Sequence, residues 1–450
     1  MTAGSAAVPL KSVATRSAAS SAATRVILAV WAIGLFSAPA RAQRAPATPP
    51  RDSARDAAAD SLAARLKRAE DAIALLQQQL GEQAASGVST RSRMQLELTG
   101  RVVVNTFRNE RRVNNADDPQ FVRPDTASVV PIGSLGMAIR QTSLGAVLNA
   151  RDVLGGRFVG DVDVDFFGGQ QPSSGGRTFP LVRLRTARGA VRWTHGEFMV
   201  GQESPLIAGV NPVSPAAMGT PGFVTAGNLW LWLPQVRATI EAGSSVRFAL
   251  QAAMLANMNG DAAGAFDTDV DLAERSGVPA TEGRVRVRWG EDDRASEIGC
   301  GGHMAYLAIA GGSSVQTYAG ACDARVVLVP GLEVRGEGYT GRGLRGLGGG
   351  GVSQNLGRSG MPLDDRGGWA QLNLDVTSLL RVGGGCGADE PREADVLAGG
   401  RLRNQSCAGY AWLRPTGPMF VGAEVRQITT RYATGSVTNN HLNLAVGFEF

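Results

Sequence analysis

The strongest constraint on the fold is a strict alternation in the last ten residues of the printed sequence, HLNLAVGFEF. Every second residue back from Phe450 is apolar, namely Phe448, Val446, Leu444 and Leu442, and the residues between them are small or polar. A period of two predicts a β-strand with one apolar face and one polar face. The alternation alone leaves open whether the apolar face meets a protein core or lipid.

Residues 1–42 have the layout of a secretory signal peptide. Arg25 precedes an apolar run from Val26 to Phe36, and Ala40 and Ala42 supply small residues for cleavage after Ala42. This run is too short to span a bilayer. No other stretch is apolar for the roughly 20 residues that a membrane helix needs. We therefore expect an exported protein without a helical anchor.

Charge and chemistry exclude several classes of function. The chain has 45 basic and 40 acidic residues, and removal of the signal peptide leaves 41 basic residues, a net charge near +1. That balance predicts no nucleic-acid partner. The three histidines lie far apart and no nucleophile motif is present, so we expect no enzyme, and we expect no cofactor and no metal. The 59 glycines suit a β protein with many turns.

The segment before the strands divides into three parts. Residues 43–60 are rich in Pro and Ala and are expected to be disordered. Residues 61–81 carry a heptad seam, which predicts a coiled-coil helix, with a single amphipathic helix packed on its own domain as the alternative. Residues 82–94 read as a linker. The seam residues, spaced 4, 3, 4, 3 and 4 apart, are Leu62, Leu66, Ala69, Ile73, Leu76 and Leu80.

From residue 95 to residue 450 the hydrophobic period is two, and about sixteen candidate strands follow one another, among them 134–149 and 228–241. Long connections such as 109–133, 204–227, 341–366 and 429–440 alternate with tight turns such as THG and VPG. Bacterial outer-membrane barrels have this arrangement, with short turns in the periplasm and long loops outside. The predicted fold class is therefore all-β: a 16-stranded antiparallel transmembrane β-barrel with an N-terminal periplasmic coiled-coil helix. In a closed barrel the last strand pairs with the first.

The richest charge pattern lies in GDVDVDFFGG and LVRLRTARGAV. A hairpin that is symmetric about Ser174 places Asp165 opposite Arg183 and Asp163 opposite Arg185. These pairs would lie on the wall of an aqueous lumen. The alternative interpretation is that they only neutralise one another and stiffen the wall.

Other arginines are expected to bias the lumen toward anions. Arg188 and Arg192 have no evident acidic partners, and an arginine on the lipid face would cost about 2–4 kcal/mol at mid-bilayer. Five tryptophans are expected at the membrane interfaces: Trp230, Trp232, Trp289, Trp369 and Trp412. The candidate pore-lining residues are Asp161, Asp163, Asp165, Arg183, Arg185, Arg188, Arg192, Arg140, Arg237, Arg284, Arg286 and Arg288.

The connection SPLIAGVNPVSPAAMGTPGFVTAGN is long, nearly uncharged and rich in Pro. An apolar segment of this kind is poorly suited to water, so we expect it to fold into the barrel as a constriction. Contact with another protomer or with lipopolysaccharide is the alternative.

Four cysteines allow three full pairings. Cys300 and Cys322 are symmetric about Gly311, and Cys386 and Cys407 flank a long loop. We favour disulfides 300–322 and 386–407, formed in the oxidising periplasm. Free or metal-bound thiols are the alternative, although the cysteines lack CxxC spacing.

The heptad segment together with LTGRVVVNTF, RQTSLGAVLNA, GDVDVDFFGG, LVRLRTARGAV and FMVGQESPLIAG resembles the DcaP-like trimeric porins of Gram-negative outer membranes. The resemblance implies a sixteen-stranded homotrimer in the outer membrane, in contact with lipid and lipopolysaccharide, with its coiled coil in the periplasm. It implies passive diffusion of small hydrophilic, preferably anionic solutes such as dicarboxylates, with Arg183, Arg185 and Arg188 in the pore. The terminal Phe450 resembles the signal that the barrel-assembly machinery recognises.

Two other functions remain open. A phosphate-selective porin would be expected to have a lysine-rich lumen, but Lys67 is the only lysine after cleavage. A structural tether with a closed lumen, whose helix binds a periplasmic partner, is the second alternative.

Overall fold

The structure is a computed structural model, and it describes residues 67, 88–89, 94–124, 133–169, 180–260, 270–290, 295–309 and 311–450. The chain divides into two units, Met1–Leu76 and Gln77–Phe450. The signal peptide, the Pro/Ala-rich start and all of the coiled-coil segment except Lys67 lie outside the described residues, so these expectations stay predictions. The expected linker includes a two-residue strand, β1 (Val88–Ser89), which pairs with β2.

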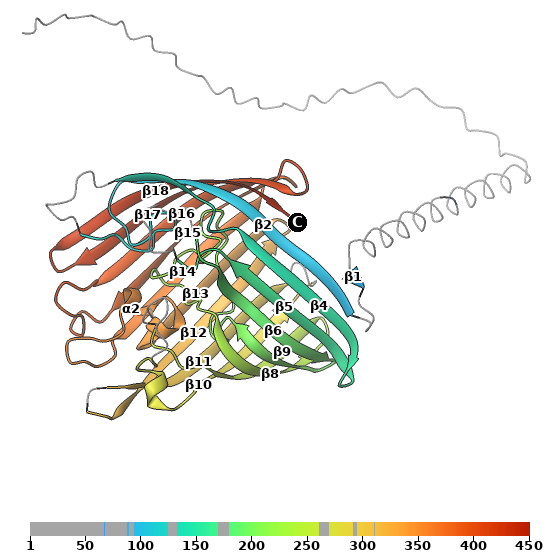
Figure 1. The fold of residues 1–450 in the computed structure, drawn as a ribbon, viewed down its shortest axis with the longest axis horizontal. Helices are drawn as coiled ribbons and strands as arrows, with labels where there is room; N and C mark the ends of the chain where they lie inside the picture. Colours follow the sequence, from blue (N-terminus) through green and yellow to red (C-terminus); the bar gives the residue numbers. More distant parts are fainter. Residues whose placement is uncertain are drawn as a thin grey trace, which may run out of the picture. The chain divides into compact units, whose positions relative to one another are not determined.

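The described residues of the second unit form one antiparallel sheet that closes on itself (Figure 1). β3 and β4 pair with successive parts of β2 and are two pieces of one barrel strand, so β2 to β18 make sixteen barrel strands. No helix in this part of the chain is long and apolar enough to cross a membrane. The strands are β2 (Met94–Asn109), β3 (Ser134–Ala138), β4 (Ser143–Val153), β5 (Gly156–Asp165), β6 (Arg183–Trp193), β7 (Gly196–Glu203), β8 (Leu233–Gly243), β9 (Val246–Leu255), β10 (Ala280–Trp289), β11 (Ser296–Ala308), β12 (Ser314–Val329), β13 (Leu332–Arg342), β14 (Asp364–Asp375), β15 (Leu380–Pro391), β16 (Arg403–Leu413), β17 (Met419–Tyr432) and β18 (Gly435–Glu449). The short helices are η1 (Glu274–Ser276), η3 (Leu344–Leu347) and α2 (Gly350–Ser353).

The seam of the barrel joins the two ends of the sheet. β18 pairs with β2 in a register that places Val446 opposite Val104. The backbone of Phe450 extends this ladder, because its N–H donates to Gly100 O at 3.0 Å and its carbonyl accepts from Gly100 N at 2.8 Å. The predicted sixteen-stranded closed barrel is confirmed.

The alternation in the sequence separates an outer wall from an inner wall. On β18, Leu444 is 46% exposed whereas the neighbouring Asn443 and Ala445 are almost completely buried. On β10, Val285 is 59% exposed whereas Arg284 is buried. Large apolar side chains therefore cover the outside of the sheet, as a lipid-facing wall requires, and polar side chains point into the barrel.

Three predicted boundaries are wrong. The expected strand 134–149 is interrupted at 139–142, because Arg140 and Gln141 turn inward to hold loops. The expected strand 228–241 begins only at Leu233, because the residues before it belong to a segment inside the barrel. The expected long loop 429–440 is a two-residue turn between β17 and β18, since its polar residues, such as Thr429 and Thr438, are paired across the strands.

Candidate functional site

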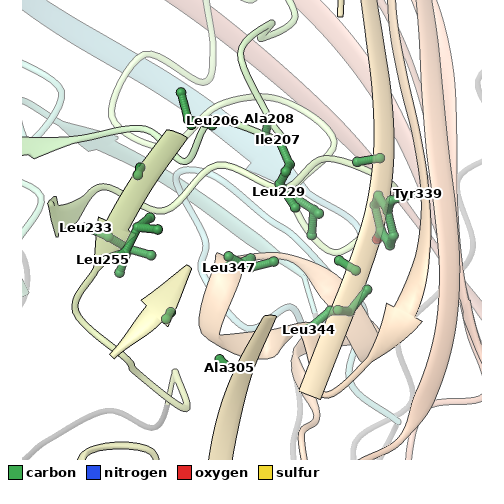
Figure 2. Close-up of a cluster of buried hydrophobic side chains, with 14 residues drawn as sticks. Leu206, Ile207, Ala208, Leu229, Leu233, Leu255, Ala305, Tyr339, Leu344 and Leu347 are labelled. Atoms are coloured by element: carbon green, nitrogen blue, oxygen red, sulfur yellow. The ribbon is translucent and has the colours of Figure 1, made fainter. Parts of the chain in front are cut away.

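The connection between β7 and β8, residues 204–232, lies inside the barrel, and we call it the inward loop. Leu206, Ile207 and Leu229 of this loop are at most 3% exposed. They pack in a cluster with residues of the barrel wall, including Leu255 and Tyr339 (Figure 2). The expectation that this segment folds into the barrel is confirmed.

Acidic side chains of the inner wall fix the backbone of the inward loop. The backbone N–H of Leu206 donates to Glu282 Oε2 at 2.5 Å, and that of Gly209 donates to Asp323 Oδ2 at 2.9 Å. An uncharged loop has few side chains that can satisfy its backbone, so the wall must supply the acceptors. Each buried N–H bonded to a charged group contributes more than a neutral hydrogen bond would.

Two glutamines hold the tip of the inward loop. Gln371 on β14 accepts a hydrogen bond from Val213 N and donates one to Val213 O, both at 2.7 Å. Gln141 donates to Ala216 O at 2.7 Å and accepts from Met218 N at 2.6 Å. A side-chain amide has one acceptor and two donors, so each glutamine pairs with the loop backbone as a neighbouring strand would.

A second segment, residues 111–124, also reaches into the barrel. Its Asp117 forms an ion pair with Arg140 at 2.6 Å, and its Asp118 forms one with Arg426 at 3.1 Å. Burial raises the pKa of Asp118 to about 7. Its Oδ2 atom is buried and has no hydrogen-bond partner among the described residues, so little besides Arg426 offsets the cost of burying its charged form.

A third segment, residues 343–363, packs on the inward loop. The backbone N–H groups of Trp230 and Leu231 donate to Leu347 O at 2.9 and 3.1 Å. Asn404 on β16 connects the other two segments, since its Nδ2 donates to Gln120 O at 2.8 Å and to Thr225 O at 3.0 Å. The end of the barrel that carries the long loops is therefore narrowed by three segments that are bonded to the wall and to one another.

The acidic and basic hairpin forms as expected, with one difference in register. Asp165 lies opposite Arg183, and their side chains form an ion pair at 2.6 Å. Asp163 lies opposite Thr186 rather than Arg185, because the register shifts between Asp163 and Val164. The side chain of Arg185 nevertheless reaches Asp163 at 2.9 Å.

The prediction that Arg188 and Arg192 lack acidic partners is wrong. Arg188 lies 2.6 Å from Asp161 and 2.5 Å from Glu203, and Arg192 lies 2.5 Å from Glu197. Glu203 and Glu197 belong to β7, whereas the hairpin considered from the sequence pairs β6 with β5 only. Asp161 is on β5 and comes to lie opposite Arg188 through the register shift after Asp163. The register of the tight turn after Trp193 places Arg192 opposite Glu197 and could have identified that pair.

The remaining candidate arginines also carry structural contacts. Arg284 lies 2.6 Å from Asp323, and Arg286 lies 3.0 Å from Glu241. Arg237 donates to Ser204 O at 2.6 Å. The last member of the triplet, Arg288, is in register with Glu297. The structure therefore brings the candidate arginines to the inner wall, where several of them hold the loops in place.

The expected placement of the tryptophans at the membrane interfaces is wrong for four of the five. Trp230 is buried in the inward loop, and Trp369 stacks on Phe223 of that loop with ring centroids 5.9 Å apart. Trp232 lies 5.1 Å from the guanidinium of Arg185, and Trp412 packs against a phenylalanine inside the barrel. The inward loop supplies apolar surface inside the lumen. The alternation of residues along the strands cannot reveal that surface, so the inward-facing tryptophans could not be recognised from the sequence.

Solved structures with the same architecture are outer-membrane channels. No family model matches the chain, and no curated protein matches it. The outer membrane channel DcaP of Acinetobacter baumannii superposes with a TM-score of 0.62 at 15% identity, over 81% of this chain and 100% of that chain. The fold is that of a DcaP-like channel. An anion-selective porin from Comamonas acidovorans superposes with a TM-score of 0.52 at 11% identity, over 79% of this chain and 100% of that chain.

The DcaP-like barrel contains a basic cluster that sequence reasoning missed. Arg325, Arg335 and Arg381 lie 2.9, 2.8 and 2.6 Å from oxygens of Glu333, and we call these four residues the Glu333 cluster. The sequence held a usable signal, because a hairpin that is symmetric about Pro330 places Arg325 opposite Arg335.

Both favoured disulfides are confirmed, and both lie on the outer wall. Cys300 bonds to Cys322 across β11 and β12, and Cys386 bonds to Cys407 across β15 and β16. Within the described ranges, no group of three or more His, Cys, Asp or Glu side chains is placed to hold a metal ion.

Proposed function

We propose that this chain forms a water-filled outer-membrane channel for the passive diffusion of small hydrophilic solutes, with a preference for anions such as dicarboxylates. The DcaP-like fold supports a channel. The inward loop supports selectivity, because it narrows the barrel beside a wall of arginines. The anion-selective porin that shares this fold supports the sign of the preference.

The observation that carries the proposal is the exposure of guanidinium groups on the inner wall. The side chains of Arg188 and Arg192 are 33% and 51% exposed even though both are ion-paired. Arg101 and Arg414 share a single carboxylate, that of Glu449. In a narrow aqueous pore, guanidinium groups raise the local concentration of carboxylates and phosphates and can bind them in bidentate fashion. Ion pairs within the wall weaken the positive electrostatic field of the pore but leave the N–H donors of these arginines accessible.

Reversal potentials in a salt gradient across planar bilayers test the proposal. Wild type is expected to favour the anion. Replacement of Arg183, Arg185 and Arg188 by Ala leaves the neighbouring carboxylates without their arginine partners. The reversal potential should therefore move toward that of a cation-selective channel. Arg366→Ala is the control, because Arg366 is 74% exposed on the outer wall and should leave the potential unchanged. A wild-type channel that prefers cations would contradict the proposal.

The same recordings separate the alternative functions. Block of the chloride current by low concentrations of inorganic phosphate would favour a phosphate-selective porin. Absence of current from a folded, inserted barrel would favour a structural tether.

We further propose a homotrimer in the outer membrane, in contact with lipid and lipopolysaccharide, with residues 61–81 as a periplasmic coiled coil and Phe450 as part of the signal for the barrel-assembly machinery. The heptad seam and the alternation of the last strand support this assembly. Native mass spectrometry in detergent is expected to give three chains per particle. A monomer would contradict the proposal.

A further inference from the structure

The Glu333 cluster places three guanidinium groups on one carboxylate. Arg325 and Arg335 are directly opposite each other on β12 and β13. Like charges at such positions repel, and Glu333 together with Asp375, which lies 3.4 Å from Arg381, cannot neutralise all three arginines. The Glu333 side chain is only 6% exposed, so its two oxygens are occupied by these contacts. The cluster therefore keeps an excess of positive charge.

Donor groups of this cluster remain available to a ligand. Among the described residues, Arg325 makes one hydrogen bond, through Nε, so neither of its terminal nitrogens has a partner there. Arg381 donates to Glu333 through one terminal nitrogen, and its Nε lies 3.4 Å from Asp375. Both side chains are about one third exposed. Arg335, in contrast, also donates to Asn211 O and so helps to hold the inward loop.

A cavity adjoins the cluster below the tip of the inward loop. It has a volume of about 750 Å³ and reaches from Val213 of that loop to the tight turns after β12 and β14. Arg381 and Arg414 line it, together with one carboxylate, Asp375, and the apolar surfaces of Val213 and Trp412. The cavity therefore combines a cationic edge with hydrocarbon surface.

We propose that this cavity is a binding site for organic carboxylates. The carboxylate group of the solute accepts hydrogen bonds from the terminal nitrogens of Arg381 and the neighbouring Arg325, and its hydrocarbon part packs against Trp412 and Val213. This site rests on the proposed function and adds to it the place in the lumen where an anionic solute binds during its passage.

The lining favours an organic carboxylate over inorganic phosphate. Phosphate shares the oxyanion chemistry that a guanidinium group recognises, but it has no hydrocarbon part to remove the surfaces of Val213 and Trp412 from water. Butyrate has both parts, and acetate has a shorter hydrocarbon part. The expected order of binding is therefore butyrate first, then acetate and inorganic phosphate.

Block of the chloride current in planar bilayers measures this site on the full-length chain. Butyrate is expected to reduce the current of wild type in a saturable way. Arg381→Gln and Arg325→Gln should each raise the half-blocking concentration by roughly tenfold, the effect of losing one charge-assisted contact. Arg381→Lys keeps the charge but loses the planar fork, so a smaller increase is expected. This conservative variant also tests the site if the glutamine variants do not fold.

Arg366→Gln is the matched control, because it removes one guanidinium from the outer wall, away from the lumen and the cavity. It should leave the half-blocking concentration of butyrate unchanged. Equal block of wild type, R381Q and R325Q would overturn the site, and so would equal half-blocking concentrations of butyrate, acetate and phosphate.

A second measurement separates failure of the site from failure of the proposed function. Trp412 lines the cavity, so butyrate should change the tryptophan fluorescence of the detergent-solubilised chain, and R381Q should shift this titration to higher concentration. A titration of this kind from a barrel without current would support the site and reject the channel. Anion-selective current without any titration would reject the site alone.

Discussion

Val213 and Gln371 form a closed pair of hydrogen bonds, in which the side-chain amide of Gln371 binds both the N–H and the carbonyl of Val213 at 2.7 Å. A single side chain on β14 thus fixes the tip of the inward loop. Because the loop itself is nearly uncharged, its position depends on such contacts from the wall.

Gln371→Ala is expected to raise the single-channel conductance. The substitution removes both hydrogen bonds to the half-buried Val213, at a cost of about 0.5–1.5 kcal/mol each, so the tip should leave the wall part of the time. Current recordings in planar bilayers would show larger or noisier steps. Gln405→Ala on the outer wall of β16 is the matched control. Steps identical to wild type would mean that the tip does not set the conductance.

Arg426→Ala is expected to destabilise the barrel strongly. Arg426 is buried and lies 2.7 Å from Glu424 and 3.1 Å from Asp118, so its removal leaves carboxylates buried without a partner. A loss of about 3–5 kcal/mol is expected in the free energy of unfolding, measured by urea titration in detergent or lipid.

The control for this variant is Arg431→Ala, which breaks an exposed ion pair with Glu393 on the outer side of the same strand. Exposed pairs contribute about 0–1 kcal/mol. Similar losses for both variants would show that burial of the Arg426 network does not decide its contribution.

The stability of the barrel should decrease as the pH rises through neutrality. Burial raises the pKa of Asp118 from its ordinary value of 3.8 to about 7, so the folded chain binds more protons than the unfolded chain between these values. The stabilisation is complete below the unfolded pKa and is lost as the pH rises through the folded pKa. Thermal unfolding of wild type should therefore have a lower midpoint at about pH 8 than at about pH 5. Asp118→Asn should reduce this difference, and an equal difference in both proteins would contradict the prediction.

The two disulfides should resist water-soluble reductants while the barrel is in a membrane. Both bonds lie on the outer wall, which is expected to face lipid or another protomer. Treatment of membranes with a phosphine reductant and a maleimide should label none of the four cysteines, and the same treatment after denaturation in SDS should label all of them. Labelling of Cys386 and Cys407 before denaturation would place that part of the wall in water.

Features that depend on neighbouring strands followed from the sequence. The alternation of Leu442 to Phe450 predicts an outer and an inner wall, and the symmetry of Cys300 and Cys322 about Gly311 predicts their pairing. Hairpin symmetry also places Asp165 opposite Arg183. All of these relationships need only a period of two and a known turn.

Features that depend on distant loops did not follow. Trp369 has the parity of the inner wall, but its apolar partner Phe223 belongs to a loop more than a hundred residues away in the sequence. The ion pair of Arg140 with Asp117 likewise depends on how a loop turns inside the barrel. The one-residue shift in strand pairing at Asp163 comes from a bulge, and a hairpin assumed to be symmetric cannot predict a bulge. The three arginines of the Glu333 cluster come from three different strands, and only one pair of them is related by a single turn.

Asn404 donates to Gln120 O in one inward segment and to Thr225 O in another, so the two segments share one attachment point on β16. Displacement of either segment strains the anchorage of its neighbour. The two segments are for that reason expected to move together. The width of the opening between them should then switch between a few discrete values instead of changing continuously.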